Sequence, residues 1–197
     1  MPGNLSSIGV FCGSSPGRDA RFAEAAGSLG RELARRHIRL VYGGGCVGLM
    51  GVLADAALAE GGEVHGVITR ALEAKEVAHL GLTSLVVVAT MHERKAAMAD
   101  RSEAFIMLPG GFGTLDEFLE VLTWTQLGIH AKPCGMLNVG GFFDPLLELF
   151  ESATRERFVR AEHRDMVVIE ADPASMIERL CSWAPVTVGK WLDRDQR

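Results

Sequence analysis

Residues 109–117 read Pro109-Gly110-Gly111-Phe112-Gly113-Thr114-Leu115-Asp116-Glu117, and this stretch carries the strongest structural signal in the chain. It follows a short apolar run at residues 104–108, which is typical of a buried strand, and it opens a helical pattern over residues 115–127. A glycine-rich turn between a strand and a helix N-terminus indicates an anion site, because glycines let backbone N–H groups approach a phosphate and the helix dipole favours negative charge there. Holding a phosphate does not require the carboxylates of Asp116 and Glu117, so the stretch indicates a site that also performs chemistry.

Apolar runs and helical patterns alternate from one end of the sequence to the other. We expect strands at residues 7–12, 38–42, 64–68, 85–88, 104–108, 133–138 and 166–169, and helices at residues 19–36, 47–60, 91–101, 115–127, 145–154 and 173–180. Continuously apolar strands separated by helices indicate a parallel sheet that is covered on both faces. The sequence therefore predicts one α/β domain over residues 1–197, with a doubly wound parallel sheet of about seven strands.

Composition and charge narrow the class of protein and its partners. The 197 residues, 48% hydrophobic and 23% charged, fit a globular domain with its own core. The net charge is −5 and no basic run stands out, which argues against nucleic acid or an anionic membrane as the main partner. The sequence has no recognisable signal peptide and no apolar run near the roughly 20 residues of a membrane helix, so we expect a cytoplasmic protein.

The cysteines lack C-x-x-C or zinc-module spacing, so we expect reduced, buried thiols at Cys12, Cys46, Cys134 and Cys181.

Turn sequences rich in small residues follow several of the predicted strands. They are Cys12-Gly13-Ser14-Ser15, Gly43-Gly44-Gly45 and the glycine-rich stretch at residues 109–113. In doubly wound sheets the ligand lies beyond the carboxyl ends of the strands. We therefore expect these turns to share one rim of the sheet and to form the ligand site there.

A structural interpretation competes with the functional one at residues 114–117. Thr-x-x-Glu before a helix is a capping box, in which Thr114 would be the N-cap and Glu117 would hydrogen bond back to it. A capping box does not require the glycines that precede it, so the glycine density favours a ligand site. Thr114 suits both interpretations, because its hydroxyl and its N–H can also bind a phosphate.

Other site motifs receive little support. Residues 43–48 match the dinucleotide pattern G-x-G-x-x-G, but the next strand ends at Ile68-Thr69-Arg70 without the acid that would hold a ribose, and Glu63 lies at the opposite end of that strand. The sequence contains no Walker A loop and no G-x-S-x-G elbow, and its histidines form no cluster. A zinc-protease helix is also disfavoured, because His92-Glu93 lacks the second histidine.

Two helices carry residues whose role the sequence leaves open. Arg94 and Lys95 near the start of the helix at residues 91–101 either form a solvated face or meet an anionic ligand at the rim. The helix at residues 115–127 has one apolar stripe of Leu115, Phe118, Leu119 and Leu122, with Val121 and Trp124 off it. Such a helix is either buried deeply within one chain or faces a second subunit, and we favour a homodimer.

The blocks Tyr42 to Gly51, Met91 to Lys95 and Pro109 to Glu117 together resemble the signature blocks of the LOG ("Lonely guy") family. Its members are cytokinin-activating phosphoribohydrolases, long labelled possible lysine decarboxylases. The stretches 123–130 and 137–143 extend the resemblance, which spans nearly the whole chain in order. Cys46 departs from the family, where serine or threonine is common.

The resemblance implies a Rossmann-like homodimer that hydrolyses the N-glycosidic bond of a nucleoside 5′-monophosphate, such as a cytokinin ribotide or AMP, to a free base and ribose 5-phosphate. It implies that Arg94 and Glu117 are the catalytic pair, and that no metal or cofactor takes part. The further substrate contacts that it implies are Glu76, Lys95, Gly111, Phe112, Gly113, Thr114 and Thr123.

Alternatives to this function remain. Lysine decarboxylation normally requires pyridoxal phosphate on a lysine, and only Lys95 lies near a predicted strand end, so the older label is disfavoured. A nucleotide-binding or carrier protein that keeps the phosphate loop without turnover is the remaining alternative. The sequence also leaves open whether Arg94 contacts the leaving base or positions Glu117.

Overall fold

The computed structural model describes residues 5–74 and 77–185, and its centre is one parallel sheet. The strands are β1 (Ser7–Phe11), β2 (Arg39–Tyr42), β3 (Val64–Thr69), β4 (Ser84–Val88), β5 (Ala104–Met107), β6 (Cys134–Leu137) and β7 (Val167–Glu170). Their order is β4-β3-β2-β1-β5-β6-β7, and every neighbouring pair is parallel. The predicted doubly wound sheet is therefore confirmed, and its direction of winding reverses between β1 and β5.

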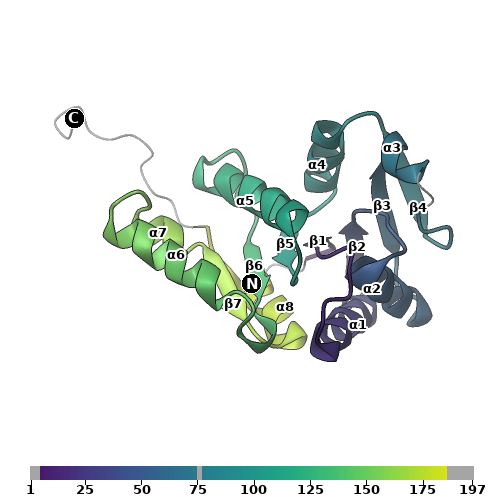
Figure 1. Ribbon diagram of the computed structural model, residues 1–197, viewed down its shortest axis with the longest axis horizontal. Coiled ribbons are helices and arrows are strands. Elements are labelled where there is room, and N and C mark those ends of the chain that lie inside the picture. Colours follow the sequence, from purple (N-terminus) through teal and green to yellow (C-terminus); the bar gives the residue numbers. More distant parts are fainter. Residues whose placement is uncertain (1–4, 75–76, 186–197) are drawn as a thin grey trace.

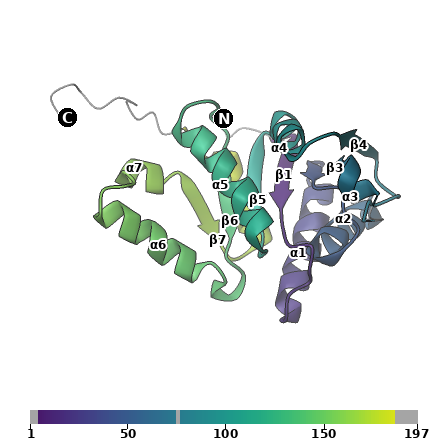
Figure 2. The same ribbon diagram turned by 45° about the horizontal axis from the view of Figure 1, so that its top comes forward.

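Helices cover both faces of this sheet (Figure 1). They are α1 (Ala20–Arg35), α2 (Gly48–Ala59), α3 (Arg70–Glu73), α4 (Met91–Asp100), α5 (Phe112–Gln126), α6 (Asp144–Arg155), α7 (Ala161–Arg164) and α8 (Pro173–Ser182), with a 3₁₀ turn at Val139–Gly141. Side chains of α1, α2 and α8 share one buried cluster with the sheet, and those of α4, α5 and α6 pack in the other. Figure 2 shows α4 and α5 together on one side of the sheet.

The buried strands form because their sequences are apolar on both faces. All five residues of β1 are buried, as are all four of β5 and of β6, whereas the edge strands β4 and β7 are partly exposed. This is the pattern expected when helices cover both faces of a parallel sheet. Each predicted strand boundary lies within one residue of the observed one.

The short helical segments were not predicted. α3 and α7 each have four residues and the 3₁₀ turn has three, so none is long enough to show a helical period in the sequence. A larger difference concerns α5, which begins at Phe112, three residues before the predicted start. Glycines at positions 111 and 113 conceal this start, because the apolar period begins only at Leu115.

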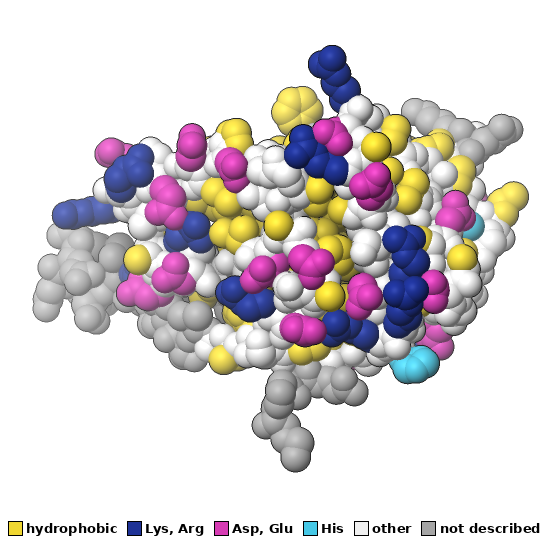
Figure 3. All heavy atoms as spheres, turned by 90° about the horizontal axis from the view of Figure 1, so that it is seen from below, with side chains coloured by type: hydrophobic (Ala, Val, Ile, Leu, Met, Phe, Trp, Pro, Cys, Tyr) yellow, Lys and Arg dark blue, Asp and Glu magenta, His cyan; other side chains and the backbone are white. Residues whose placement is uncertain are grey.

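The surface carries charges of both signs. Figure 3 shows the molecule from below relative to Figure 1, and on this face Lys and Arg side chains are interspersed with Asp and Glu. Ion pairs in the described part of the chain include Arg35 with Glu60 and Arg36 with Glu178. In the described part of the chain, no helix is long and apolar enough to cross a membrane.

The contact between α1 and α2 depends on a glycine. A Cβ at Gly30 would collide with the carbonyl oxygen of Leu53 and lie 3.1 Å from the backbone nitrogen of Ala57, so the two helices could not approach as closely. Gly27, one turn earlier on α1, has room, because the nearest atom is 3.2 Å away at the flexible end of Arg31.

We predict that Gly30→Ala lowers the free energy of unfolding by about 1–3 kcal/mol, the usual cost of overpacking. The matched variant Gly27→Ala is expected to raise it by about 0.5–1 kcal/mol, because alanine loses less backbone entropy than glycine in a helix. Denaturant unfolding of both variants measures the difference. Equal stability of the two would contradict the close approach of α1 and α2 at Gly30.

Candidate active site

Strands β1 and β5 bring the predicted turns together at the carboxyl end of the sheet. The Leu108 N–H donates to the Phe11 carbonyl at 2.9 Å, and the Gly13 N–H donates to the Pro109 carbonyl at 3.0 Å. The Leu49 N–H then donates to the Gly13 carbonyl at 3.0 Å, which places the start of α2 beside the same turn. The three turns therefore share one rim, as predicted.

A cavity of about 510 Å³ lies at this rim, within the usual size of small-molecule sites. Its lining comes from the end of β1, the turn before α2, the end of β3, α3, and the first turns of α4 and α5. It includes six of the residues predicted for the site, namely Arg94, Gly111, Phe112, Gly113, Thr114 and Glu117.

One end of the cavity is the N-terminus of α5. Gly111 is the N-cap residue in an extended conformation, and no side chain caps the helix. The first N–H groups of a helix have no partner within the helix, and the helix dipole makes this end attractive to an anion. Thr114 lies inside the first turn and is buried. The capping-box interpretation of Thr114 is thus wrong, because the helix begins before it.

Arg94 and Glu117 form a buried ion pair beneath this helix end. Arg94 Nη1 donates to Glu117 Oε1 at 2.7 Å, and the two residues are only 7% and 8% exposed. The guanidinium is also fixed by the sheet, because Nε donates to the Val67 carbonyl at 3.0 Å and Nη2 to the Gly43 carbonyl at 3.3 Å. Arg94 therefore does not lie on a solvated face, and Glu117 pairs with Arg94 rather than capping its own helix.

The glycine at position 43 makes this arrangement possible. A Cβ at Gly43 would overlap the guanidinium of Arg94. The dinucleotide-like pattern at residues 43–48 therefore has a local explanation that involves no dinucleotide. Glu63, the acid considered for a ribose, instead pairs with Arg39 at 3.0 Å, just before β3 begins at the opposite end of the sheet.

Burial shifts the pKa of two groups in the cavity. Desolvation raises the pKa of the Glu117 carboxyl above its usual range, although the Arg94 guanidinium works in the opposite direction. Burial, and to a smaller extent the nearby Glu117 carboxylate, also raise the pKa of the Cys12 thiol. A carboxyl with a raised pKa beside a fixed cation is typical of functional sites.

Two other predicted contacts, Lys95 and Thr123, do not line this cavity. Lys95 Nζ pairs with Asp116 at 3.1 Å and with Glu120 at 3.2 Å, and it lies outside the cavity lining. Thr123 is exposed on α5, and its hydroxyl donates to the Leu119 carbonyl at 2.6 Å. Glu76 lies outside the described residues.

The expectation for the cysteines holds only in part. The described cysteines are free, and Cys12 and Cys134 are buried, which raises the pKa of Cys134 to about 12. Cys181 is half-buried, and Cys46 is exposed, so the expected burial is wrong for Cys46. Cys46 is exposed because it lies in the glycine turn that precedes α2 at the rim.

Part of the cavity lining is apolar, and the sequence did not reveal it. This apolar wall consists of Met50, Ile68, Leu72, Val77 and Met91. These residues come from five separate segments and share no period or motif. Met50 and Met91 belong to two of the quoted sequence blocks, so only those blocks could have pointed to this wall.

Lysine decarboxylation would need a lysine in the cavity to hold pyridoxal phosphate, and metal chemistry would need a cluster of ligating side chains. Of the described lysines, Lys95 is paired with two carboxylates, and Lys132 donates to the Ala99 carbonyl at 2.7 Å; neither lines the cavity. Within residues 5–74 and 77–185, no group of three or more His, Cys, Asp and Glu side chains could hold a metal ion.

The fold defines a Rossmann-like α/β protein, and its cavity lies at the topological switch point of the sheet. The family model described as possible lysine decarboxylase matches residues 50–180. The chain is 52% identical over 166 residues to the probable cytokinin riboside 5′-monophosphate phosphoribohydrolase LOGL1 of Oryza sativa subsp. japonica, covering 84% of this chain and 74% of the relative. It is also 52% identical over 167 residues to the cytokinin riboside 5′-monophosphate phosphoribohydrolase of Rhodococcoides fascians, covering 84% of each. The chain therefore belongs to the LOG family of phosphoribohydrolases.

Solved structures of lower identity share the fold. The molybdenum cofactor binding protein from Rippkaea orientalis superposes with a TM-score of 0.67 at 23% identity, covering 87% of this chain and 93% of that one. The molybdenum cofactor carrier protein from Chlamydomonas reinhardtii also gives a TM-score of 0.67, at 21% identity, covering 88% and 96%. At this identity the likeness concerns the fold alone.

Proposed function

We propose that this chain hydrolyses the N-glycosidic bond of nucleoside 5′-monophosphates, releasing the free base and ribose 5-phosphate. The observation that carries the proposal is the buried Arg94–Glu117 pair, which lies in the same cavity as the N-terminus of α5. The names of the relatives from Oryza sativa subsp. japonica and Rhodococcoides fascians support a ribotide substrate.

The cavity suggests how the substrate is oriented. The phosphate lies on the N–H groups of Gly111, Phe112, Gly113 and Thr114, where the helix dipole favours it. Glu117 lies one helical turn beyond Thr114, about 4.5 Å along the axis, which is close to the span of a ribose. The anomeric carbon then lies beside the Glu117 carboxylate, and the base extends toward the apolar wall.

The chemistry follows from the charge that develops on the sugar. Cleavage of an N-glycosidic bond places positive charge on the ribose ring, as in glycoside hydrolysis. The Glu117 carboxylate stabilises this charge and accepts a proton from the attacking water, whose oxygen bonds to the anomeric carbon. The electrons of the broken bond leave with the base, which takes up a proton. This reaction requires neither a metal ion nor an organic cofactor.

The contacts of Arg94 favour a positioning role. Three of its nitrogen atoms already donate to Glu117, Val67 and Gly43, so the guanidinium is held in one place. This fixes the Glu117 carboxylate, and the guanidinium charge lowers the pKa of that carboxyl against the larger, raising effect of burial. A guanidinium has five N–H donors, so Arg94 retains donors for the departing base as well.

The apolar wall bears on which base is accepted. Met50, Leu72, Val77 and Met91 offer apolar contact, which suits an adenine that carries an apolar N6 substituent as well as adenine itself. Both cytokinin ribotides and AMP are therefore proposed substrates. The contacts of Glu76, Lys95 and Thr123 with substrate remain proposals from the family resemblance; in one chain, Lys95 and Thr123 would have to rearrange, or act from a second copy, to reach it.

A carrier function is the alternative for this fold. A protein that only binds a nucleotide needs the helix N-terminus but not a buried carboxylate held beside it. The Arg94–Glu117 pair therefore favours hydrolysis. Binding of AMP without release of adenine would favour the carrier.

The remaining proposals concern assembly and location. We propose a single domain over residues 1–197, because one sheet joins all the described strands, and a cytoplasmic location. We also propose a homodimer through α5 and the turn after it. Leu119, Leu127 and Ile129 are 36%, 40% and 64% exposed there, which is unusual for neighbouring leucine and isoleucine side chains.

We predict that Glu117→Gln lowers kcat with AMP by about a hundredfold or more, the usual range for a lost acid–base group. Glutamine is nearly isosteric and keeps an oxygen that can accept from Arg94, so the melting temperature should change little. Free adenine, separated by chromatography, measures the rate. Glu120→Gln is the matched control, because Glu120 lies one turn further along α5 and outside the cavity lining.

Retention of activity in Glu117→Gln, or an equal loss in Glu120→Gln, would contradict the role of Glu117.

The preference for AMP over adenosine tests the proposed phosphate site. The phosphate end supplies binding energy that orients the sugar, so AMP should be hydrolysed faster than adenosine. Equal rates would rule out the proposed phosphate site.

The pH dependence should reflect the buried carboxyl. Burial raises the pKa of Glu117, and the reaction uses the ionised form, so kcat/KM should fall as pH decreases through a pKa above the usual value of about 4.3. In Arg94→Met the loss of the neighbouring cation should move this acid limb to higher pH. An acid limb at an ordinary carboxyl pKa, or a shift to lower pH in the variant, would contradict this account.

The dimer is tested by the mass in solution. Light scattering should give twice the chain mass of 21.2 kDa, and Leu119→Glu combined with Ile129→Glu should give the monomer. Leu80→Glu is the control, because Leu80 is a fully exposed apolar residue at 97% and lies away from α5. A monomeric wild-type protein would contradict the proposal.

A further inference from the structure

A short segment crosses the glycine turn at the rim. We call Val77–His79 the clamp segment, because both its ends are hydrogen bonded to that turn. The Cys46 N–H donates to the Val77 carbonyl at 2.8 Å, and the His79 N–H donates to the Gly44 carbonyl at 2.9 Å. Between them Gly45 and Ala78 form an isolated antiparallel bridge.

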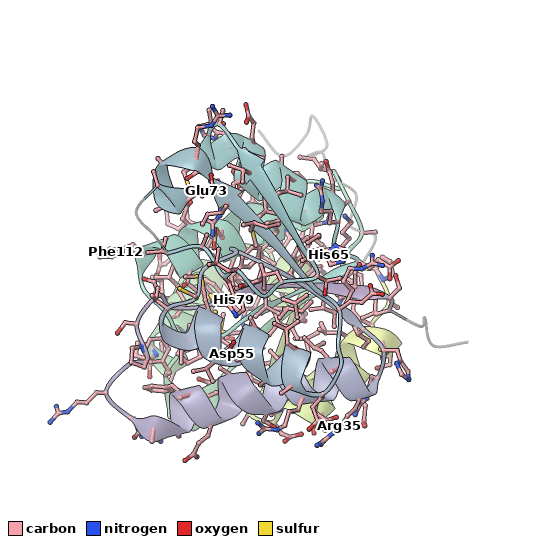
Figure 4. All side chains as sticks on the ribbon, turned by 90° about the vertical axis from the view of Figure 1, so that its right-hand side faces the viewer. Arg35, Asp55, His65, Glu73, His79 and Phe112 are labelled. Carbon is pink, nitrogen blue, oxygen red and sulfur yellow. The ribbon has the colours of Figure 1, made fainter. Side chains whose placement is uncertain are left out.

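The imidazole of His79 anchors the clamp segment to α2. Its Nε2 lies 2.9 Å from Asp55 Oδ1, and its Nδ1 accepts from the Gly81 N–H at 3.1 Å. The Gly81 N–H can only donate, so Nδ1 is the acceptor and Nε2 carries the proton that Asp55 accepts. Figure 4 shows His79 beside α2, which carries Asp55, while His65 lies toward the other end of the sheet.

The clamp segment and the turn beneath it both belong to the cavity. Val77 is part of the apolar wall, and Gly43 and Gly45 line the same space. Gly43 also supplies the carbonyl that receives Arg94 Nη2. Three consecutive glycines have no side chains with which to hold their own conformation and lose much backbone freedom on ordering. Contacts from outside the turn must therefore contribute to its order.

We propose that His79 is a positioning residue for substrate binding: through Asp55 it fixes the clamp segment, and thereby the apolar wall and the glycine turn. The part of this proposal that concerns substrate rests on the proposed function. The part that concerns the order of the turn does not.

The exposure of His79 and Asp55 determines how much the loss of their contact should weaken the hold on the clamp segment. Asp55 is 72% exposed at its side chain, and an exposed polar contact of this kind contributes little by itself. His79, in contrast, is only 12% exposed and is hydrogen bonded at both ring nitrogens. Its removal leaves the clamp segment held to the turn by backbone contacts only, with no link to α2 through this side chain.

Replacements at His79 separate its two contacts. His79→Gln places an amide N–H near the position of Nε2 and keeps the contact with Asp55. His79→Asn places an oxygen near the position of Nδ1 and keeps only the contact with Gly81. If anchoring to α2 is what matters, the Gln variant retains function and the Asn variant behaves like His79→Ala.

The kinetic test compares these variants with AMP as substrate. We expect KM to rise about three- to tenfold in His79→Ala and His79→Asn, the range for a lost hydrogen bond, with a smaller fall in kcat. His79→Gln and the control His65→Ala, a histidine replacement at the start of β3, should stay within about twofold of wild type, a difference within the context-dependence of single contacts. A rise in KM that is equal in the Gln and Asn variants, or no rise in His79→Ala, would overturn the proposal.

Hydrogen exchange gives a readout that does not depend on activity. The amides of Cys46 and His79 should exchange at least about threefold faster in His79→Ala, whereas the Gly13 amide, bonded to Pro109, should be unchanged. If the amides of Cys46 and His79 exchanged at the wild-type rate in His79→Ala, the proposed role of His79 in fixing the clamp segment would be overturned, even if the enzyme were active. Absence of hydrolysis in the wild-type protein would instead contradict the proposed function, and the exchange comparison would still decide the role of His79.

Discussion

The pairing of β1 with β5 is the constraint on which the site depends. These strands are neighbours in the sheet although they are far apart in the chain, and the winding reverses between them. Helices that follow β1 and β5 leave toward opposite faces, so the rim stays open at that point. The hydrogen bond from Gly13 to Pro109 continues the pairing beyond the strands and places the glycine-rich turn at the open rim.

The electrostatics of the cavity follow from this arrangement. α5 begins at the rim and presents its N-terminus to an anion, while Glu117 lies one turn inside and is buried. A buried carboxylate is costly unless it is paired. Arg94 supplies the pairing, and carbonyl groups of β3 and of the glycine turn hold the guanidinium. The cavity thus combines a helix N-terminus, whose dipole favours an anion, with a fixed carboxylate, and the proposed ribotide hydrolysis rests on these two features together.

Much of this arrangement was predictable from the sequence, and the exceptions have physical causes. Buried strands such as β5 are continuously apolar, so their positions could be predicted within a residue. The start of α5 is at Phe112 rather than at the predicted Leu115, because its N-cap residue, Gly111, has no side chain that would signal a cap. The family resemblance identifies Arg94 and Glu117 as site residues. The two residues are 23 positions apart in the sequence, so no local pattern predicts that they contact each other. The His79–Asp55 contact, 24 residues apart, had no signal at all.

The central claim is that a single cavity holds the phosphate on the first turn of α5 and places the anomeric carbon at Glu117. A crystal structure of Glu117→Gln with AMP tests it most directly, because the variant should bind the nucleotide without cleaving it. The account predicts phosphate oxygens on the N–H groups of residues 111–114, the ribose C1′ beside residue 117, and adenine against the wall that includes Val77. A phosphate bound elsewhere, or a C1′ remote from residue 117, would contradict it.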